Sequence, residues 1–151
     1  MKLKKQIAAL PVRIDHKGRL RVLMVTSRDT GRWVMPKGWP MEGKKPWRAA
    51  EIEAMEEAGV LGTISKDEIG TYKYPKKLSE KRSVECKVTL YPMYVGKMMK
   101  RWPERDERRR KWFSPKRASK LVKEPQLRVL LKSLRDKKAR KPIMRFVKDA
   151  A

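Results

Sequence analysis

One stretch of the chain, residues 36–60 with the sequence PKGWPMEGKKPWRAAEIEAMEEAGV, constrains the fold more than any other. Pro46 suits the first helical position, because its missing N–H has no partner there and its φ is already helical. Gly59 suits the residue just past a helix end, where a left-handed backbone is usual. The stretch therefore predicts a helix from Lys45 to Ala58, about three to four turns long.

The expected helix has two unlike faces. Glu53, Glu56 and Glu57 are spaced i, i+3 and i+4, so they project from one side. The opposite side carries apolar residues that can pack inward. These residues are Trp47, Ala50, Ala54, Met55 and Ala58.

The acidic face of this helix is physically costly. Like charges at this spacing repel by roughly 0.2–0.5 kcal/mol per pair. Glu56 and Glu57 also lie in the last turn, where the helix dipole disfavours anions. No lysine or arginine on that face of the helix neutralises them. A solvated acidic face is one interpretation; a site for a hard divalent cation such as Mg²⁺, which takes oxygen ligands, is the one we favour in so basic a chain.

These residues resemble the Nudix box, whose pattern is Gly, five residues, Glu, seven residues, then Arg-Glu-apolar-x-Glu-Glu-x-Gly-apolar. Gly38 opens the pattern, and two positions depart from it, because Lys44 replaces the first Glu and Ile52 replaces the Arg. The resemblance covers roughly residues 5–134. The flanking RWVMPKGWP and EEAGVLG, with the later WPERDERRRKWF, look most like the diphosphoinositol polyphosphate phosphohydrolase branch. The positions that match at the expected spacing are Glu53, Ala54, Glu56, Glu57, Gly59 and Val60.

The resemblance implies an α/β fold, namely a Nudix α/β/α sandwich with a mixed β-sheet. The box helix would cover one side of that sheet and C-terminal helices the other. It also implies a Mg²⁺-dependent hydrolase, with Mn²⁺ as the alternative ion. The expected substrate is a polyphosphorylated small molecule with a phosphoanhydride (diphosphate) bond, such as a diphosphoinositol polyphosphate, a dinucleoside polyphosphate or another nucleoside diphosphate derivative.

The box residues then receive roles. Glu56 and Glu57 are the expected metal ligands. Glu53 is either a third ligand or the catalytic base that takes a proton from the attacking water, and spacing alone does not separate the two roles. By resemblance, the backbone carbonyl of Lys37, next to Gly38, is a further metal ligand.

Residues around the box are candidates for substrate binding. Gly38 lets the backbone pass close to a ligand. Arg28, Arg32 and Lys37 would face the phosphates, where arginine's planar fork binds oxygens in pairs. The competing interpretation is that they are merely three of the 41 Lys and Arg residues. Some Nudix enzymes use an acid from a later loop. Glu104 and Glu107 are the candidates here, with local pairing to neighbouring arginines as the alternative.

The two departures from the box bear on activity. In the family, the box arginine pairs with an acid and holds the central Glu in place, which Ile52 cannot do. Lys44 could instead form a salt bridge to a helix carboxylate. The alternative function is therefore a catalytically weak Nudix-fold protein that binds RNA or another polyanion through its basic surface.

Charge and composition indicate the number of domains, the class of partner and the cellular location. The chain has 151 residues, a net charge of +24 and 38% charged residues. Its length suits one domain with a real core, and a field of this sign attracts polyphosphates and nucleic acid. Cys86 is the single cysteine, which precludes an intrachain disulfide and fits a reducing compartment. No apolar run reaches membrane-spanning length, so we expect a cytoplasmic protein. The sequence carries no indication of oligomeric state.

The rest of the chain supplies the other elements. We expect one Nudix domain, residues 1–136, and a solvated basic C-terminal tail, residues 137–151, with no sustained hydrophobic period. Alternation of apolar and polar residues predicts the strand at residues 83–95, and a dense apolar run predicts one at residues 20–26. Ser114 and Pro115 are typical of a helix start. The expected strands are Gln6–Ile14, Leu20–Thr26, Ile69–Tyr74 and Ser83–Val95, and the expected late helices are Ser114–Val122 and Pro125–Leu134. The basic stretch Pro75–Arg82 is expected to be a loop at a hairpin tip that could touch an anionic substrate.

Overall fold

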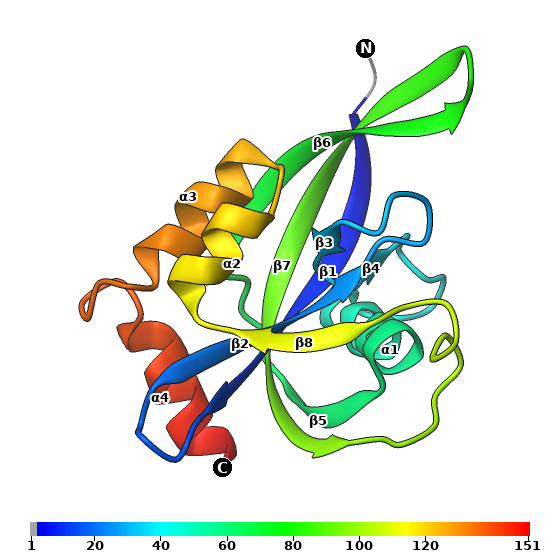
Figure 1. Cartoon of the computed structure of the whole chain (residues 1–151). Coiled ribbons are helices and arrows are strands. Elements are labelled where there is room, and N and C mark those ends of the chain that lie inside the picture. Colours follow the sequence, from blue (N-terminus) through cyan, green and yellow to red (C-terminus); the bar gives the residue numbers. More distant parts are fainter. Residues whose placement is uncertain (1–2) are drawn as a thin grey trace.

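Two long strands form the centre of the molecule. The structure is a computed structural model that describes residues 3–151; the first two residues of the expected domain lie outside the described part. Strands β1 (Leu3–Ile14) and β7 (Arg82–Met98) run parallel, with Leu3 opposite Glu85 and Val12 opposite Tyr94 (Figure 1). Residues 6–12 of β1 and 90–93 of β7 are buried, so this part of the two strands forms the floor on which the other elements pack.

The remaining strands pair antiparallel around this centre. The order along the sheet is β3-β2-β1-β7-β5, with β4 on β1, β6 on β7 and β8 on β2. A sheet with one parallel and several antiparallel pairs is mixed, so the expected sheet type is confirmed. The bounds are β2 Leu20–Thr26, β3 Trp33–Val34, β4 Lys37–Gly38, β5 Val60–Ile64, β6 Gly70–Ser79 and β8 Arg110–Phe113.

Helices cover both faces of the sheet. Helix α1 (Pro46–Ala58) packs on one face, and α2 (Pro115–Leu121), α3 (Pro125–Ser133) and α4 (Lys141–Ala150) pack on the other (Figure 1). Each face has its own hydrophobic cluster. The α/β/α sandwich is therefore confirmed. No helix of residues 3–151 combines the length and apolar character needed to cross a lipid bilayer.

Helix α1 begins and ends as its sequence predicts. Pro46 occupies the first turn, and Gly59 has a φ of 64° and donates its N–H to the Met55 carbonyl at 3.0 Å. Ala50, Ala54 and Ala58 are fully buried against the sheet. Trp47 packs at the edge of the same cluster, whereas Met55 is only half-buried. The small alanines let α1 approach the sheet closely, which fixes the position of its acidic residues.

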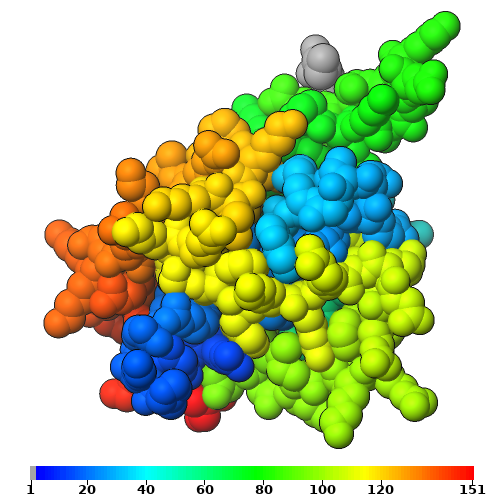
Figure 2. Space-filling view, viewed as in Figure 1, coloured from blue at the N-terminus to red at the C-terminus, as the bar shows by residue number. Residues whose placement is uncertain are grey.

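The basic loop expected at residues 75–82 is much shorter in the structure, although the expected hairpin tip within it is confirmed. Most of it continues β6, which pairs with β7 to form a long hairpin whose tip projects from the body of the molecule (Figure 2). Lys76 lies opposite Val84 and Lys77 opposite Ser83 in this ladder. The dense lysines hid the strand, because an exposed ribbon leaves both faces polar and removes the alternation that identifies strands.

The expected solvated tail is also wrong for residues 141–150. They form α4, in which Ile143 and Val147 are 1% and 4% exposed and join the cluster beneath α2 and α3. Their i, i+4 spacing places them on one side of the helix, with Lys and Arg on the other. Burial of two aliphatic side chains makes α4 part of the packed fold.

Candidate active site

The centre of the site is a pair of carboxyl groups at the C-terminal half of α1. Glu53 and Glu57 are one turn apart and share a side-chain hydrogen bond. The Glu53 carboxylate lies against Gly38 of β4: a Cβ on Gly38 would be only 2.4 Å from the Glu53 Cδ atom. The box glycine therefore leaves the space that the Glu53 carboxylate occupies.

Burial and proton sharing dominate the electrostatics of this pair. Glu57 is 5% exposed, and burial, together with its hydrogen bond to Glu53, raises its pKa to about 8. Burial also raises the pKa of Glu53; the hydrogen bond from Glu57 opposes this, while the charges of Glu56 and Glu104 add to it. The raised pKa of Glu57 therefore favours a proton on this side chain at neutral pH.

This arrangement fits a hard cation. The buried carboxyl of Glu57 and the half-buried carboxyl of Glu53, with Glu56 and Glu104 beside them, supply oxygen donors and the negative charge that a divalent ion would neutralise. Within residues 3–151, no three Asp, Glu, His or Cys side chains converge as a ready-made metal cage. Carboxylates without a cation repel one another, so they spread apart or share protons in pairs.

The loop between β7 and β8, residues 99–109, closes over the end of α1. The Glu104 N–H donates to the Glu56 carbonyl at 3.0 Å, and the Trp102 indole N–H donates to the Glu57 carbonyl at 3.2 Å. Arg110 of β8 donates to the Ala58 carbonyl at 2.9 Å, and its guanidinium stacks 3.9 Å from the centre of the Trp102 ring. These donors satisfy carbonyls that a helix end leaves unpaired. The loop is thereby held against the acidic pair.

The two candidate acids of this loop have different surroundings. Glu104 is partly buried and accepts a hydrogen bond from Arg108 Nε at 2.8 Å. Glu107 is more exposed and accepts from Arg28 Nη1 at 3.2 Å. Local pairing with arginines thus holds for both residues. Glu104 nevertheless lies close enough to raise the pKa of Glu53, so it belongs to the acidic cluster.

The structure gives the three expected phosphate-binding cations different positions. Arg28 is exposed beside Glu107. Arg32 directs its two terminal nitrogens to the Glu124 carboxylate at 3.1 and 3.4 Å, and that carboxylate is 3% exposed. Arg32 therefore ties its loop to the start of α3 and has a structural role.

Lys37 lies partly inside the protein. Its ammonium is 5.1 Å from the centre of the Tyr74 ring, and burial lowers its pKa, while the nearby carboxylates of Glu57 and Glu124 partly restore it. The positive charge of Lys37 is therefore held next to the acidic pair. Its neighbour Gly38 contacts Glu53, so β4 carries both an acid contact and a cation.

Sequence reasoning missed Trp102, Arg108 and Arg110, which hold the loop and the acids together. Arg108 and Arg110 are two of several arginines in the run ERDERRRKWF, and no local pattern separates them from their neighbours. Lys44 is exposed and takes part in no ion pair within the described part of the chain. The intrahelical pair on α1 joins Arg48 and Glu51 instead.

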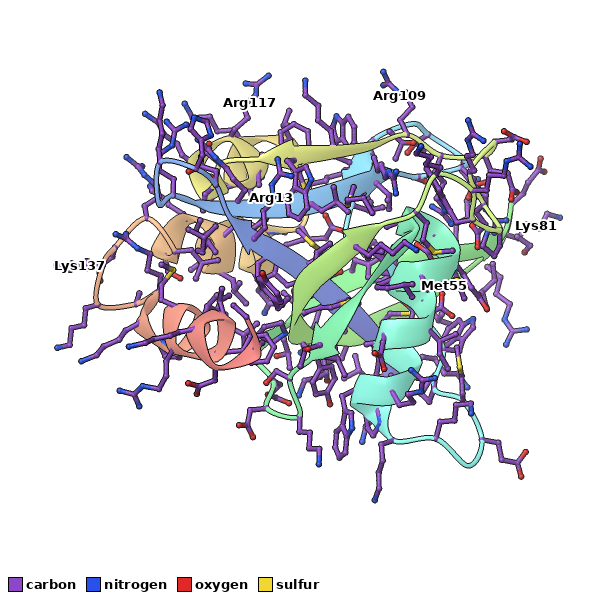
Figure 3. The ribbon with its side chains drawn as sticks, turned by 90° about the horizontal axis from the view of Figure 1, so that it is seen from below. Arg13, Met55, Lys81, Arg109, Arg117 and Lys137 are labelled. Atoms are coloured by element: carbon purple, nitrogen blue, oxygen red, sulfur yellow. The ribbon has the colours of Figure 1, made fainter. Side chains whose placement is uncertain are left out.

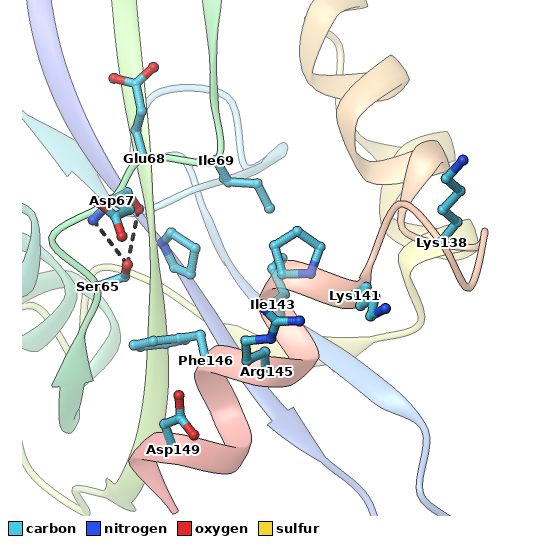
Figure 4. Close-up of a pocket in the computed structure, with 12 residues that line it drawn as sticks. Ser65, Asp67, Glu68, Ile69, Lys138, Lys141, Ile143, Arg145, Phe146 and Asp149 are labelled. Carbon is cyan, nitrogen blue, oxygen red and sulfur yellow. Dashed lines mark hydrogen bonds between the residues drawn. The ribbon is translucent and has the colours of Figure 1, made fainter.

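A separate groove of about 660 Å³ lies between α4 and the turn that joins β5 to β6 (Figure 4). The Ser65 hydroxyl closes that turn by hydrogen bonds with the Asp67 backbone, and Ile143 and Phe146 form part of the opposite wall. None of the box-helix acids lines this groove.

The raised pKa of Glu57 predicts a pH-dependent stability in EDTA. Unfolded Glu57 loses its proton near pH 4.5, whereas the folded side chain keeps it to about pH 8. The free energy of unfolding should therefore fall as pH rises between these values, because the folded state then binds the extra proton. Chemical denaturation at about pH 5, 6, 7 and 8 measures this slope.

Glu57→Gln is the control for that slope. A glutamine does not titrate, so the variant should show a flatter dependence on pH. Equal slopes for the two proteins would contradict a buried, titrating Glu57.

The chain resembles known proteins over most of its length. The NUDIX domain matches residues 4–134. "Nudix hydrolase 13, mitochondrial" of Arabidopsis thaliana is 35% identical over 118 residues, which cover 73% of this chain and 57% of that protein. The human "Diphosphoinositol polyphosphate phosphohydrolase 3-alpha" is 26% identical over 121 residues, covering 79% of this chain and 69% of that protein. This chain thus spans little more than half the length of the plant relative.

Among solved structures, a C. elegans Ap4A hydrolase in a binary complex superposes with a TM-score of 0.62 and 22% identity. The superposition covers 85% of this chain and 93% of that one. The likeness concerns the fold alone. Because the NUDIX match extends over most of the length and the box acids gather where α1 meets β4, this chain belongs to the Nudix family.

Proposed function

We propose that this protein is a Mg²⁺-dependent hydrolase that cleaves a phosphoanhydride bond in a polyphosphorylated small molecule. The observation that carries the proposal is the hydrogen-bonded pair of buried Glu57 and half-buried Glu53, with Glu53 packed against Gly38. Such a pair is costly without a cation and is suited to holding one. Mn²⁺ is the other ion that would fit this set of oxygens.

The names of two similar proteins support the proposed substrate class. One relative is named for diphosphoinositol polyphosphates, and a solved neighbour is named for Ap4A. A diphosphoinositol polyphosphate, a dinucleoside polyphosphate or another nucleoside diphosphate derivative shares one feature, a phosphoanhydride flanked by further negative charge. The net charge of +24 favours any such anion. The cytoplasmic location expected from the sequence stays a prediction.

The residues divide into those that hold the ion and those that act on water and substrate. Glu56 and Glu57, with the backbone carbonyl of Lys37, would hold the ion. When bound, Mg²⁺ offsets phosphate charge and orients the leaving group. Glu53 is either a third ligand or the base that accepts a proton from water as the water oxygen bonds to phosphorus and the bridging P–O bond breaks. Glu104 is the second candidate for that base.

The cations around the site would bind the substrate's phosphates. Lys37 is held beside the acids by its partial burial, and Arg28 is exposed at the rim. Arg28 could leave Glu107 and bind a phosphate at little cost in free energy, because exposed ion pairs contribute only about 0–1 kcal/mol. Arg32 would have to give up its buried partner Glu124, which makes it the weaker candidate.

The test is phosphate release from a panel of nucleotide, dinucleoside polyphosphate and inositol pyrophosphate substrates, with Mg²⁺, with Mn²⁺ and in EDTA. We expect turnover of at least one substrate that requires the metal. Absence of metal-dependent release across the panel would contradict the hydrolase.

Binding of RNA or another polyanion is the second candidate function. From Arg109 to Lys148 the only acids are Glu124 and Asp136, and Glu124 is buried against Arg32. Arg109 and Arg117 project from the same side of the molecule (Figure 3). Such a surface should give a binding constant for a single-stranded RNA oligomer that falls steeply with salt. Fluorescence anisotropy at several salt concentrations measures it, and binding unaffected by Glu57→Gln would separate it from catalysis.

A further inference from the structure

Arg108 joins three parts of the structure at the edge of the acidic pair. Its Nε donates to Glu104 Oε1 at 2.8 Å, and its Nη1 donates to the Thr26 carbonyl of β2 at 3.0 Å. Its Nη2 lies 3.7 Å from Glu57 Oε1 of α1. The side chain is only 10% exposed. Every nitrogen of the guanidinium therefore faces a different element.

We propose that Arg108 is a positioning residue that holds Glu57 and Glu104 in the arrangement needed to receive the metal ion. The inference rests on the proposed function, because it concerns the same acids. A planar, always charged guanidinium can place one carboxylate and one carbonyl at fixed angles while remaining near a second carboxylate. A lysine ammonium carries the charge without this fixed fork.

Helix α1 does not supply this cation itself. The residue before Glu53 is Ile52, which carries no charge. Arg48 pairs with Glu51 on the same helix. Within residues 3–151, Arg108 is the Lys or Arg that lies within salt-bridge distance of Glu57. Besides Lys37 of β4, whose charge also acts on Glu57, a cation within salt-bridge distance of this acid thus comes from the loop that closes over the helix end.

The anchor on β2 explains how Arg108 stays in place. Thr26 receives two further contacts from the same loop: its N–H donates to the Arg109 carbonyl at 3.0 Å, and its hydroxyl accepts from the Arg109 N–H at 2.9 Å. These backbone contacts fix the residue next to Arg108 regardless of its own side chain. The main chain next to Arg108 is therefore held against β2, which favours the direction that its side chain takes.

Arg109 supplies a matched control. Its side chain is exposed, and its guanidinium lies 5.6 Å from the centre of the Trp33 ring, away from the acids. Arg109→Gln removes one positive charge from the same loop, as Arg108→Gln does. A difference between the two variants cannot come from net charge.

The experiment measures Mn²⁺ affinity by electron paramagnetic resonance, and kcat and KM on the best substrate of the panel, for wild type, Arg108→Gln, Arg108→Lys and Arg109→Gln. For Arg108→Gln we expect Mn²⁺ affinity and kcat each to fall about 10- to 100-fold, as for other residues that orient metal ligands, with a smaller change in KM. Arg108→Lys should recover part of both losses, and Arg109→Gln should stay within about twofold of wild type.

The outcomes separate this inference from the proposed function. A wild type that turns over no substrate contradicts the hydrolase, while the Mn²⁺ titration still tests Arg108. Wild-type affinity and kcat in Arg108→Gln would overturn the inference. Circular dichroism checks the fold of each variant. If Arg108→Gln does not fold, the test uses Arg108→Lys instead. Mn²⁺ affinity and kcat equal to wild type in Arg108→Lys would show that the planar guanidinium is not required, which would overturn the inference.

Discussion

Replacing Glu57 by glutamine is expected to lower kcat about 1,000-fold or more. The carboxylate that would hold the ion becomes a neutral amide, and a bound metal contributes several kcal/mol of charge stabilisation, each 1.36 kcal/mol of which is tenfold in rate. The fold should survive, because folded Glu57 already carries a proton at neutral pH and glutamine resembles that protonated form. Phosphate release with saturating Mg²⁺ measures the first effect and thermal unfolding the second.

Two further variants make this prediction specific. Glu56→Gln should also abolish metal-dependent turnover if it is the second ligand. Glu51→Gln alters the same helix but removes only a carboxylate paired with Arg48, so activity should stay near wild type. Unchanged activity in both the Glu56 and Glu57 variants would show that the acidic cluster is not the metal site.

Gly38→Ala should lower kcat about 100-fold while the fold stays intact. The new methyl group would be 2.4 Å from the Glu53 Cδ atom, so the carboxylate must move out of its place beside Glu57. The obstructed atoms are the far end of a flexible side chain, so moving them costs little stability. A displacement of about 1 Å at a catalytic group can cost about 100-fold in rate. Parallel measurements of kcat and of the melting temperature separate the two effects.

Gly96→Ala is the matched control for that change. A methyl group there would meet its nearest neighbour, the Leu61 carbonyl, at an ordinary 3.7 Å, and Gly96 lies in β7 away from the box. It should therefore retain wild-type kcat. A Gly38→Ala protein as active as Gly96→Ala would mean that the position of Glu53 is not critical for catalysis.

The sequence by itself determined α1 and the set of acids that it presents. Pro46 and Gly59 act within one turn of the helix ends, and the spacing of Glu53 and Glu57 follows from 3.6 residues per turn. The sandwich was also predictable, because the box and its flanks resemble a family with that fold. These features depend on contacts between residues close in the chain, or on a pattern long enough to identify.

Only the tertiary structure decided which charges meet. Arg32 and Glu124 are 92 residues apart and pair across a buried contact, and Arg108 reaches Glu57 from a loop that closes over the helix end. In a chain with 41 cations, composition cannot select the one that lies beside a given acid. For the same reason the sequence did not predict α4. Ile143 and Val147 can be identified as core residues only once the sheet face and the two helices that they pack with are known. Long-range packing and burial, which no short window of sequence contains, decided these contacts.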